Sequence, residues 1–238
     1  IGPGPGTLTQ RLLATGARVT AIEIDDAPVL HLDEAFREEQ NAKQLLLHHD
    51  DALKADWPDD VTKVVANIPY QISSPLIKKL TRHLKAQTNP IAHVVLMLQL
   101  EFAQRLSMNH PADIGSLGLT VALDWDVEEH HIVPPHHFSP QPAVQSQVVG
   151  MKPHGREFPV DKRLLQQMIH HAFDQRRKKI RSSMKKAPRR ISRIKGWHAQ
   201  RWKDAMQSLQ DLDIMNARPE QLTLEDWVDY AKKVEKGS

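Results

Sequence analysis

The sequence contains no cysteine, and only 5% of its residues are aromatic, two of them tyrosines. Without thiols there can be no disulfide bond, no thiolate-bound zinc, no iron–sulfur cluster and no cysteine nucleophile. The longest uninterrupted apolar run covers residues 94–98, far short of the roughly 20 residues that a membrane-spanning helix needs. With 40% hydrophobic and 26% charged residues among 238, the composition is that of a globular protein with one large domain, or one large and one small domain.

Charges of opposite sign gather in different parts of the chain. The net charge is +3 overall, but −7 over residues 1–150 and +10 over residues 151–238. Such an asymmetry predicts two modules, the second of which faces a polyanion. A break at Lys152-Pro153-His154-Gly155 places the boundary, so we expect one domain over residues 1–154 and another over residues 155–238.

Strand-like and helix-like segments alternate in the first module. Apolar runs predict strands over residues 18–25, 45–47, 63–67 and 93–99. Apolar periodicity predicts one helix before these strands, over residues 8–14, and two between them, over residues 27–40 and 74–85. This alternation is typical of a mostly parallel sheet covered by helices on both faces. Two further strands, over residues 125–133 and 144–151, are expected to end the sheet with an antiparallel strand at one edge.

The second module shows helical periodicity only. The expected helices cover residues 161–173, 174–187, 198–209 and 223–235. We therefore expect a small all-α domain after the α/β domain.

Gly2, Gly4 and Gly6 lie between the end of a strand and the start of a helix. Glycines there let the backbone adopt positive φ angles and approach a ligand closely. Glu23 ends the next strand about 20 residues later, where a carboxylate can accept hydrogen bonds from both hydroxyls of a ribose. This pattern predicts a nucleoside-containing cofactor and leaves open whether it is NAD or S-adenosylmethionine. The spacing Gly-x-Gly-x-Gly already departs from the dinucleotide pattern Gly-x-Gly-x-x-Gly.

Asp51 follows the expected strand that includes Leu45-Leu46-Leu47. The carboxyl ends of parallel strands line one crevice, so Asp51 is placed to accept a hydrogen bond from the exocyclic amine of an adenine ring. Asp50 is its neighbour, and the sequence does not decide which of the two carboxylates faces the crevice.

The segment Asn67-Ile68-Pro69-Tyr70 closes the next strand. The exocyclic amine of adenine is a poor nucleophile, and two carbonyl oxygens that accept its N–H bonds would aim its lone pair at an electrophilic methyl group. Asn67 offers one such oxygen, Pro69 fixes the backbone that offers another, and Tyr70 offers a ring for a flipped base to stack on. Phe138, in a proline-rich stretch, is the expected second stacking face.

A dense run of cations lies between Asp174 and Lys195. Its eleven members are Arg176, Arg177, Lys178, Lys179, Arg181, Lys185, Lys186, Arg189, Arg190, Arg193 and Lys195. Lysine and arginine at this density predict a surface that contacts nucleic-acid phosphates, and such contacts position the RNA without reading its sequence. The fourteen histidines include four adjacent pairs, but neighbouring side chains diverge, so we expect no metal site.

Together these motifs resemble the rRNA adenine dimethyltransferase family. The resemblance runs through nearly the whole chain, in segments 1–9, 21–25, 51–53, 66–75, 98–106, 133–142, 172–180 and 218–222. It implies a Rossmann-like class I methyltransferase sheet with a small helical domain, and S-adenosylmethionine as methyl donor. It implies that the substrate is two adjacent adenosines in the 3′-terminal hairpin of small-subunit rRNA, each of which is dimethylated.

The family pattern also implies roles for the residues singled out above. Gly2, Gly4 and Gly6 would wrap the methionine part of the cofactor. Glu23 would hold its ribose, and Asp51 would hold its adenine. Asn67, which borders the cofactor, would hold the target base together with Pro69, Tyr70 and Phe138. The expected partner is a small ribosomal subunit in assembly, bound in the cytoplasm by a monomeric enzyme without a membrane anchor.

Two departures from the family pattern stand out. Asp50 occupies a position where the family usually has glycine. The chain also begins at Ile1, inside the glycine motif, and we expect the family's preceding Gln-Asn-Phe-Leu-type motif and central strand to be missing. Residues 1–238 alone are accordingly expected to be unstable or inactive.

Three other functions compete with this interpretation. A large-subunit rRNA adenine methyltransferase of the antibiotic-resistance type would share the Asn-Ile-Pro-Tyr chemistry, but the Phe138 stretch and the segment from Gln175 to Lys178 favour the small-subunit type. A non-catalytic rRNA-binding assembly factor would keep the fold, but intact Glu23, Asn67 and Tyr70 argue against it. The Asn67–Tyr70 motif argues against a nicotinamide-dependent dehydrogenase.

Overall fold

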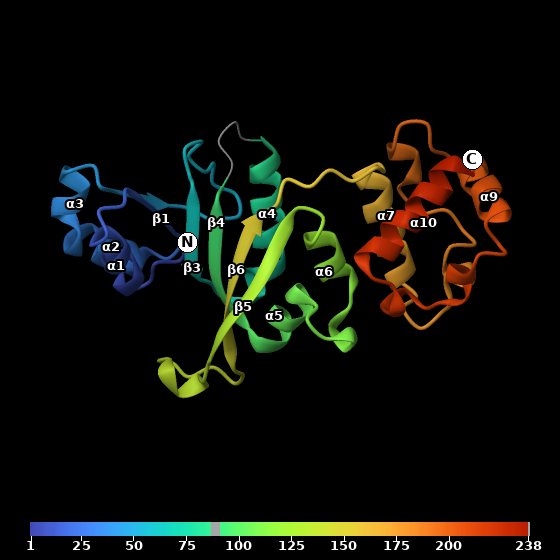
Figure 1. The fold of residues 1–238 in the computed structure, drawn as a ribbon. Helices are drawn as coiled ribbons and strands as arrows, with labels where there is room; N and C mark the ends of the chain where they lie inside the picture. Colours follow the sequence, from blue (N-terminus) through green and yellow to red (C-terminus); the bar gives the residue numbers. More distant parts are fainter. Residues whose placement is uncertain (87–90, 238) are drawn as a thin grey trace. The chain divides into compact units, whose positions relative to one another are not determined.

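The computed structural model describes residues 1–86 and 91–237; residues 87–90 and 238, which fall within the two expected domains, lie outside the described part. The chain divides into two compact units (Figure 1). The first comprises Ile1–Ala103 and Glu128–Pro153, and the second comprises Gln104–Val127 and His154–Ser238. One division falls beside the expected boundary, whereas residues 104–127, which were expected in the first domain, cluster with the second unit.

The strands of the first unit form two hydrogen-bonded groups. Strands β1 (Val19–Glu23) and β2 (Leu45–His49) pair in parallel. The second group has the order β3-β4-β6-β5, and its members are β3 (Lys63–Asn67), β4 (His93–Gln99), β6 (Ser146–Pro153) and β5 (Trp125–Val133). Strand β3 is parallel to β4, and β6 is antiparallel to β4. The antiparallel strand, β6, therefore lies between β4 and β5 and not at the edge of the sheet as expected. The edge position belongs to β5, which precedes β6 in the chain, and the chain then returns to pair with β4.

The residues of β4 explain why this strand lies inside the sheet. Val94, Leu96 and Leu98 alternate along it and are fully buried. Burying each of these side chains contributes about 1.5 to 3 kcal/mol relative to leaving it in water. The strand ends at Gln99, and α5 (Leu100–Ser107) begins at the next residue.

The helices of the first unit connect these strands. Helix α1 (Thr7–Leu13) follows the glycine motif, and α4 (Ser73–Ala86) follows a short 3-10 turn, Tyr70–Ile72, after β3. The segment expected to be one helix over residues 27–40 is two, α2 (Asp26–Ala35) and α3 (Arg37–Asn41). It breaks at Phe36, whose φ of −118° and ψ of 31° are not helical and whose ring is buried.

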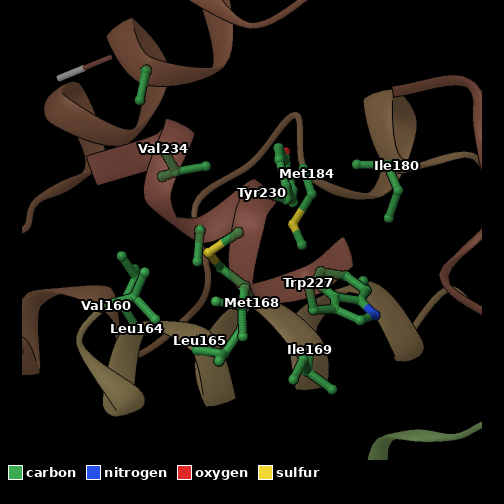
Figure 2. Packing of buried hydrophobic residues seen from close by; sticks show 14 of the residues in the cluster. Val160, Leu164, Leu165, Met168, Ile169, Ile180, Met184, Trp227, Tyr230 and Val234 are labelled. Carbon is green, nitrogen blue, oxygen red and sulfur yellow. The ribbon is translucent and has the colours of Figure 1, made fainter. Parts of the chain in front are cut away.

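The second unit is helical and has its own hydrophobic core, part of which Figure 2 shows. Its helices are α6 (Ser116–Val121), α7 (Lys162–Phe173), α8 (Ile180–Ser183), α9 (Ala199–Ser208) and α10 (Leu224–Lys236). Leu119 and Leu123 belong to this core, together with Trp202 and Trp227. Their burial explains why residues 104–127 group with the second unit.

The expected helix over residues 174–187 is wrong for most of its length. Only Ile180–Ser183 form a helix there; of the four consecutive cations before it, Arg176 and Arg177 lie in a turn, Lys178 in a bend, and Lys179 is extended. Like charges crowded along a helix destabilise it, and the backbone N–H of Ile180 is bonded to the carbonyl of Ala217 instead (2.9 Å). Across residues 1–86 and 91–237, none of the helices combines the length and the hydropathy that crossing a membrane requires.

Candidate active site

Glu23 is held at the end of β1 by the backbone around it. Its carboxylate is buried, and Oε1 accepts hydrogen bonds from the N–H groups of Ile24 (2.8 Å) and Asp25 (3.1 Å). Its Oε2 accepts a third from Gly4 of the glycine loop (3.1 Å). An ionised carboxylate has about four acceptor positions, so Glu23 is fixed in place and still able to accept from a ligand hydroxyl.

The glycine loop adopts the backbone that its sequence predicts. Gly2, Gly4 and Gly6 have φ angles of 58°, 53° and 83°, a region that other residues rarely adopt. Gly6 is constrained by packing as well, because a Cβ added there would lie 2.5 Å from Cε2 of Phe36 and 2.8 Å from Cδ2 of Leu32. The loop therefore packs directly on the end of α2.

Replacing Gly6 with alanine should lower the free energy of unfolding by about 2 to 4 kcal/mol, since it adds overpacking to an unfavourable φ angle. Gly16→Ala is the matched control: Gly16 has a φ of 82° but nothing within 4 Å of an added Cβ, so only the φ cost of about 1 to 2 kcal/mol applies. Urea denaturation of both variants measures the difference. Equal losses would show that packing on Phe36 contributes nothing.

Asp50 and Asp51 lie beside Glu23, as the sheet predicts. The backbone N–H of Asp50 donates to the carbonyl of Glu23 (2.8 Å), just after the register pair Glu23–His49. Asp51 is the less exposed of the two, and its Oδ1 accepts from the N–H of Leu53 (2.9 Å). That hydrogen bond, helped by the nearby Lys54 ammonium, lowers the pKa of Asp51, so this carboxylate is an ionised acceptor.

Two side chains that the sequence did not single out hold the loop that carries Asp51. The indole N–H of Trp57 donates to the carbonyl of Ala52 (3.0 Å) inside the protein. Lys79 of α4 donates to the carbonyl of Ala55 and lies 5.0 Å from the centre of the Trp57 ring. Burial lowers the pKa of Lys79. No sequence motif signals these contacts, and those of Lys79 join the loop to a helix more than twenty positions away.

The Asn67–Tyr70 segment and Phe138 line one open cavity of about 220 Å³. Its lining residues are Asn67, Ile68, Pro69, Tyr70, Gln71, Phe138, Pro140 and Pro142. Ile68 is buried and anchors the segment, Pro69 has a φ of −56° and a ψ of 130°, and Tyr70 opens the 3-10 turn. A Cβ added to Gly2 would lie 4.0 Å from Cδ of Pro69, so the glycine loop borders this segment. The expected base-binding residues are thus brought together beside the expected cofactor loop.

The eleven cations of residues 176–195 are all exposed. Buried apolar residues that belong to the core of the second unit recur between them, namely Ile180, Met184, Ile191 and Ile194, and Trp197 follows the last cation. Anchoring the segment from within leaves the cations on its outer side. Arg176 forms an ion pair with Glu220 (2.6 Å). Among the residues that the structure describes, no group of three or more histidine, aspartate or glutamate side chains could hold a metal ion.

The sequence matches the family description "Ribosomal RNA adenine dimethylase" over residues 1–201. The chain belongs to the ribosomal RNA adenine dimethylase family. It is therefore a member of an enzyme family of rRNA adenine dimethyltransferases, with the Rossmann-like methyltransferase fold that the sequence predicts.

Relatives of this dimethylase carry names from the same family. The "Probable ribosomal RNA small subunit methyltransferase A" of Haloarcula marismortui is 38% identical over 97% of this chain and 76% of its own length. The "Ribosomal RNA small subunit methyltransferase A" of Synechocystis sp. is 35% identical over 96% of this chain and 80% of its own length.

Two solved structures are similar to this chain over most of its length. A dimethyladenosine transferase from Plasmodium falciparum superimposes with a TM-score of 0.80 at 25% identity, covering 99% of this chain and 88% of that one. The 23S rRNA methyltransferase ErmE superimposes with a TM-score of 0.64 at 22% identity, covering 97% of this chain and 88% of its own, which shows a shared fold alone.

Proposed function

We propose that this dimethylase transfers methyl groups from S-adenosylmethionine to the exocyclic amines of two adjacent adenosines in the 3′-terminal hairpin of small-subunit rRNA. The observation that carries the proposal is the cavity in which Asn67, Pro69, Tyr70 and Phe138 meet beside the glycine loop. The small-subunit names of its relatives support this substrate. We further propose that it acts as a monomer on a subunit in assembly in the cytoplasm.

The residues at the ends of β1 and β2 fit S-adenosylmethionine. The buried carboxylate of Glu23 retains acceptor capacity for ribose hydroxyls, and the ionised Asp51 can accept from an adenine amine. Gly2 and Gly4 carry no side chain between the loop backbone and a ligand. The bound cofactor would supply an electrophilic methyl group on a cationic sulfur, which suits the negative charge of this unit.

Asn67, Pro69, Tyr70 and Phe138 would act on the target base. The side-chain carbonyl of Asn67 and a backbone carbonyl of the segment would accept both N–H bonds of the amine and so orient its lone pair. Tyr70 and Phe138 would stack on the two faces of the flipped adenine. No strong base is required, because the methylated amine can release its proton to water. Catalysis would rest on positioning.

Lys79→Ala should weaken binding of S-adenosylmethionine about three- to tenfold, because the loop that carries Asp51 loses its hydrogen bond to α4. Isothermal titration calorimetry with the cofactor measures the dissociation constant. Lys78→Ala is the matched control, since Lys78 is exposed on the same helix. The same loss of affinity in both variants would contradict the anchoring role.

A tritiated-methyl transfer assay tests the proposed function. The full-length protein is incubated with small subunits that lack the modification, with large subunits as the comparison, and labelled positions are mapped by mass spectrometry. Two neighbouring dimethyladenosines in the small-subunit rRNA are expected. Methylation of large subunits only would indicate the antibiotic-resistance type, and RNA binding without methylation would indicate a non-catalytic assembly factor.

A further inference from the structure

We infer that Ser146 is a positioning residue that fixes the far end of the Tyr70 ring in the cavity. The inference rests on the proposed function of Tyr70 as a stacking face for the target adenine. Its basis is one contact between distant parts of the chain: the hydroxyl oxygens of Tyr70 and Ser146 lie 2.6 Å apart, a short hydrogen bond.

Ser146 offers a fixed partner for that hydrogen bond. It is fully buried and is the first residue of β6, where it stands opposite Gln99 of β4. The preceding carbonyl, that of Gln145, accepts from the N–H of Leu100 (3.0 Å). The backbone on both sides of the Ser146 hydroxyl is therefore fixed by the sheet.

Tyr70 is held at its other end as well. Its backbone carbonyl accepts a hydrogen bond from the hydroxyl of Ser73, a buried residue at the start of α4 (2.8 Å). With the carbonyl and the phenol oxygen both bonded, the ring cannot swing about the Cα–Cβ bond without breaking the contact to Ser146. Tyr70, held in this way, lines the same cavity as Phe138.

The position of Ser146 gives the contact a wider effect. Ser146 lies four residues after Pro142, the end of the proline-rich stretch that carries Phe138, so the hydrogen bond joins Tyr70 to the strand that follows that stretch. A phenyl ring stacks without its hydroxyl, so what the hydroxyl adds here is a fixed position of the ring. Loss of the contact should therefore slow methyl transfer more than it weakens RNA binding, which phosphate contacts dominate.

Ser146→Ala, Tyr70→Phe and the double variant test the coupling. Each single variant should lower the single-turnover rate of methyl transfer about tenfold, and the double variant should be no slower than either, because both remove one contact. The dissociation constant for the rRNA hairpin should stay within about twofold. Ser208→Ala, which loses a surface hydroxyl in the second unit, should keep the wild-type rate. If Ser146→Ala does not fold, Tyr70→Phe removes the same hydrogen bond and carries the test.

The chain has only two tyrosines, so the contact can also be observed directly. Labelling with 3-fluorotyrosine should give two fluorine resonances, and Tyr70→Phe assigns them. Ser146→Ala should move the Tyr70 resonance and leave that of Tyr230, which is buried against Met206 and Met215. An unmoved Tyr70 resonance, or a wild-type rate in Ser146→Ala, overturns the inference. A wild-type protein that does not methylate rRNA, yet shows the shift, refutes the proposed function and with it the role assigned to Ser146.

Discussion

Asn67→Ala should reduce methyl transfer by about 10² to 10³, the cost of removing one preorganised polar group from a reaction centre, while RNA binding persists. Asn67 is the last residue of β3 and is paired with Met97 of β4, so the sheet fixes its Cα. Its side chain is exposed at the cavity, where its carbonyl can accept from the adenine amine. Alanine removes this acceptor and leaves Tyr70 and Phe138 in place.

The decisive measurement is the single-turnover rate on rRNA, taken together with the dissociation constant for the hairpin. Asn41→Ala, an exposed amide at the end of α3, serves as the control and should behave as wild type. An Asn67→Ala enzyme with full activity would refute the role assigned to this residue. A loss of RNA affinity equal to the loss of rate would assign Asn67 to binding instead of to the chemical step.

Binding of the rRNA hairpin should weaken several hundredfold between about 50 mM and 200 mM salt. The estimate assumes about five phosphate contacts from the cations of residues 176–195, each contributing roughly 0.9 to the logarithmic salt slope. All eleven cations are exposed, and one acidic residue, Asp174, lies in the same stretch of sequence. Fluorescence anisotropy with a labelled hairpin over a salt series measures the slope.

A pair of charge variants locates the effect. Replacing Arg189 and Arg190 with glutamine should reduce the salt slope by about 2, because two phosphate contacts are lost. Replacing Lys233 and Lys236, which are exposed on α10, changes the net charge equally and should leave the slope unchanged. A flat salt response of the wild-type protein, or equal effects of the two pairs, would contradict the phosphate-binding role of the segment.

The sequence predicts the strands better than their arrangement. Residues 63–67, 93–99 and 125–133 are strands with the expected bounds. The position of β6 between β4 and β5 depends on pairing between distant segments, which local sequence patterns do not encode. The same holds for residues 174–187, where exposed cations and the Ala217 carbonyl displace an otherwise helical pattern.

In the candidate site, too, some residues can be predicted from the sequence and others cannot. Glu23 stands out in sequence because it ends the strand that follows the glycine motif, Asn67 because it opens the Asn-Ile-Pro-Tyr segment, and Phe138 because it lies in a proline-rich stretch. Lys79 and Ser146 do not stand out, because a lysine on a helix and a serine at a strand end are ordinary there. Their significance comes from contacts with Ala55 and Tyr70 that appear only when distant segments meet.

The chain passes between its two units three times, at residues 103–104, 127–128 and 153–154. Neither unit is a single stretch of sequence, so a gene cut at residue 154 would deprive the helical unit of Leu119 and Leu123 from its core. The helical unit cannot therefore be fused to another enzyme, or exchanged between relatives, as one terminal cassette. Recombination that preserves both cores has to transfer residues 104–127 together with residues 154–238. Because residues 128–153 of the first unit lie between these two segments, the two units are expected to be inherited together.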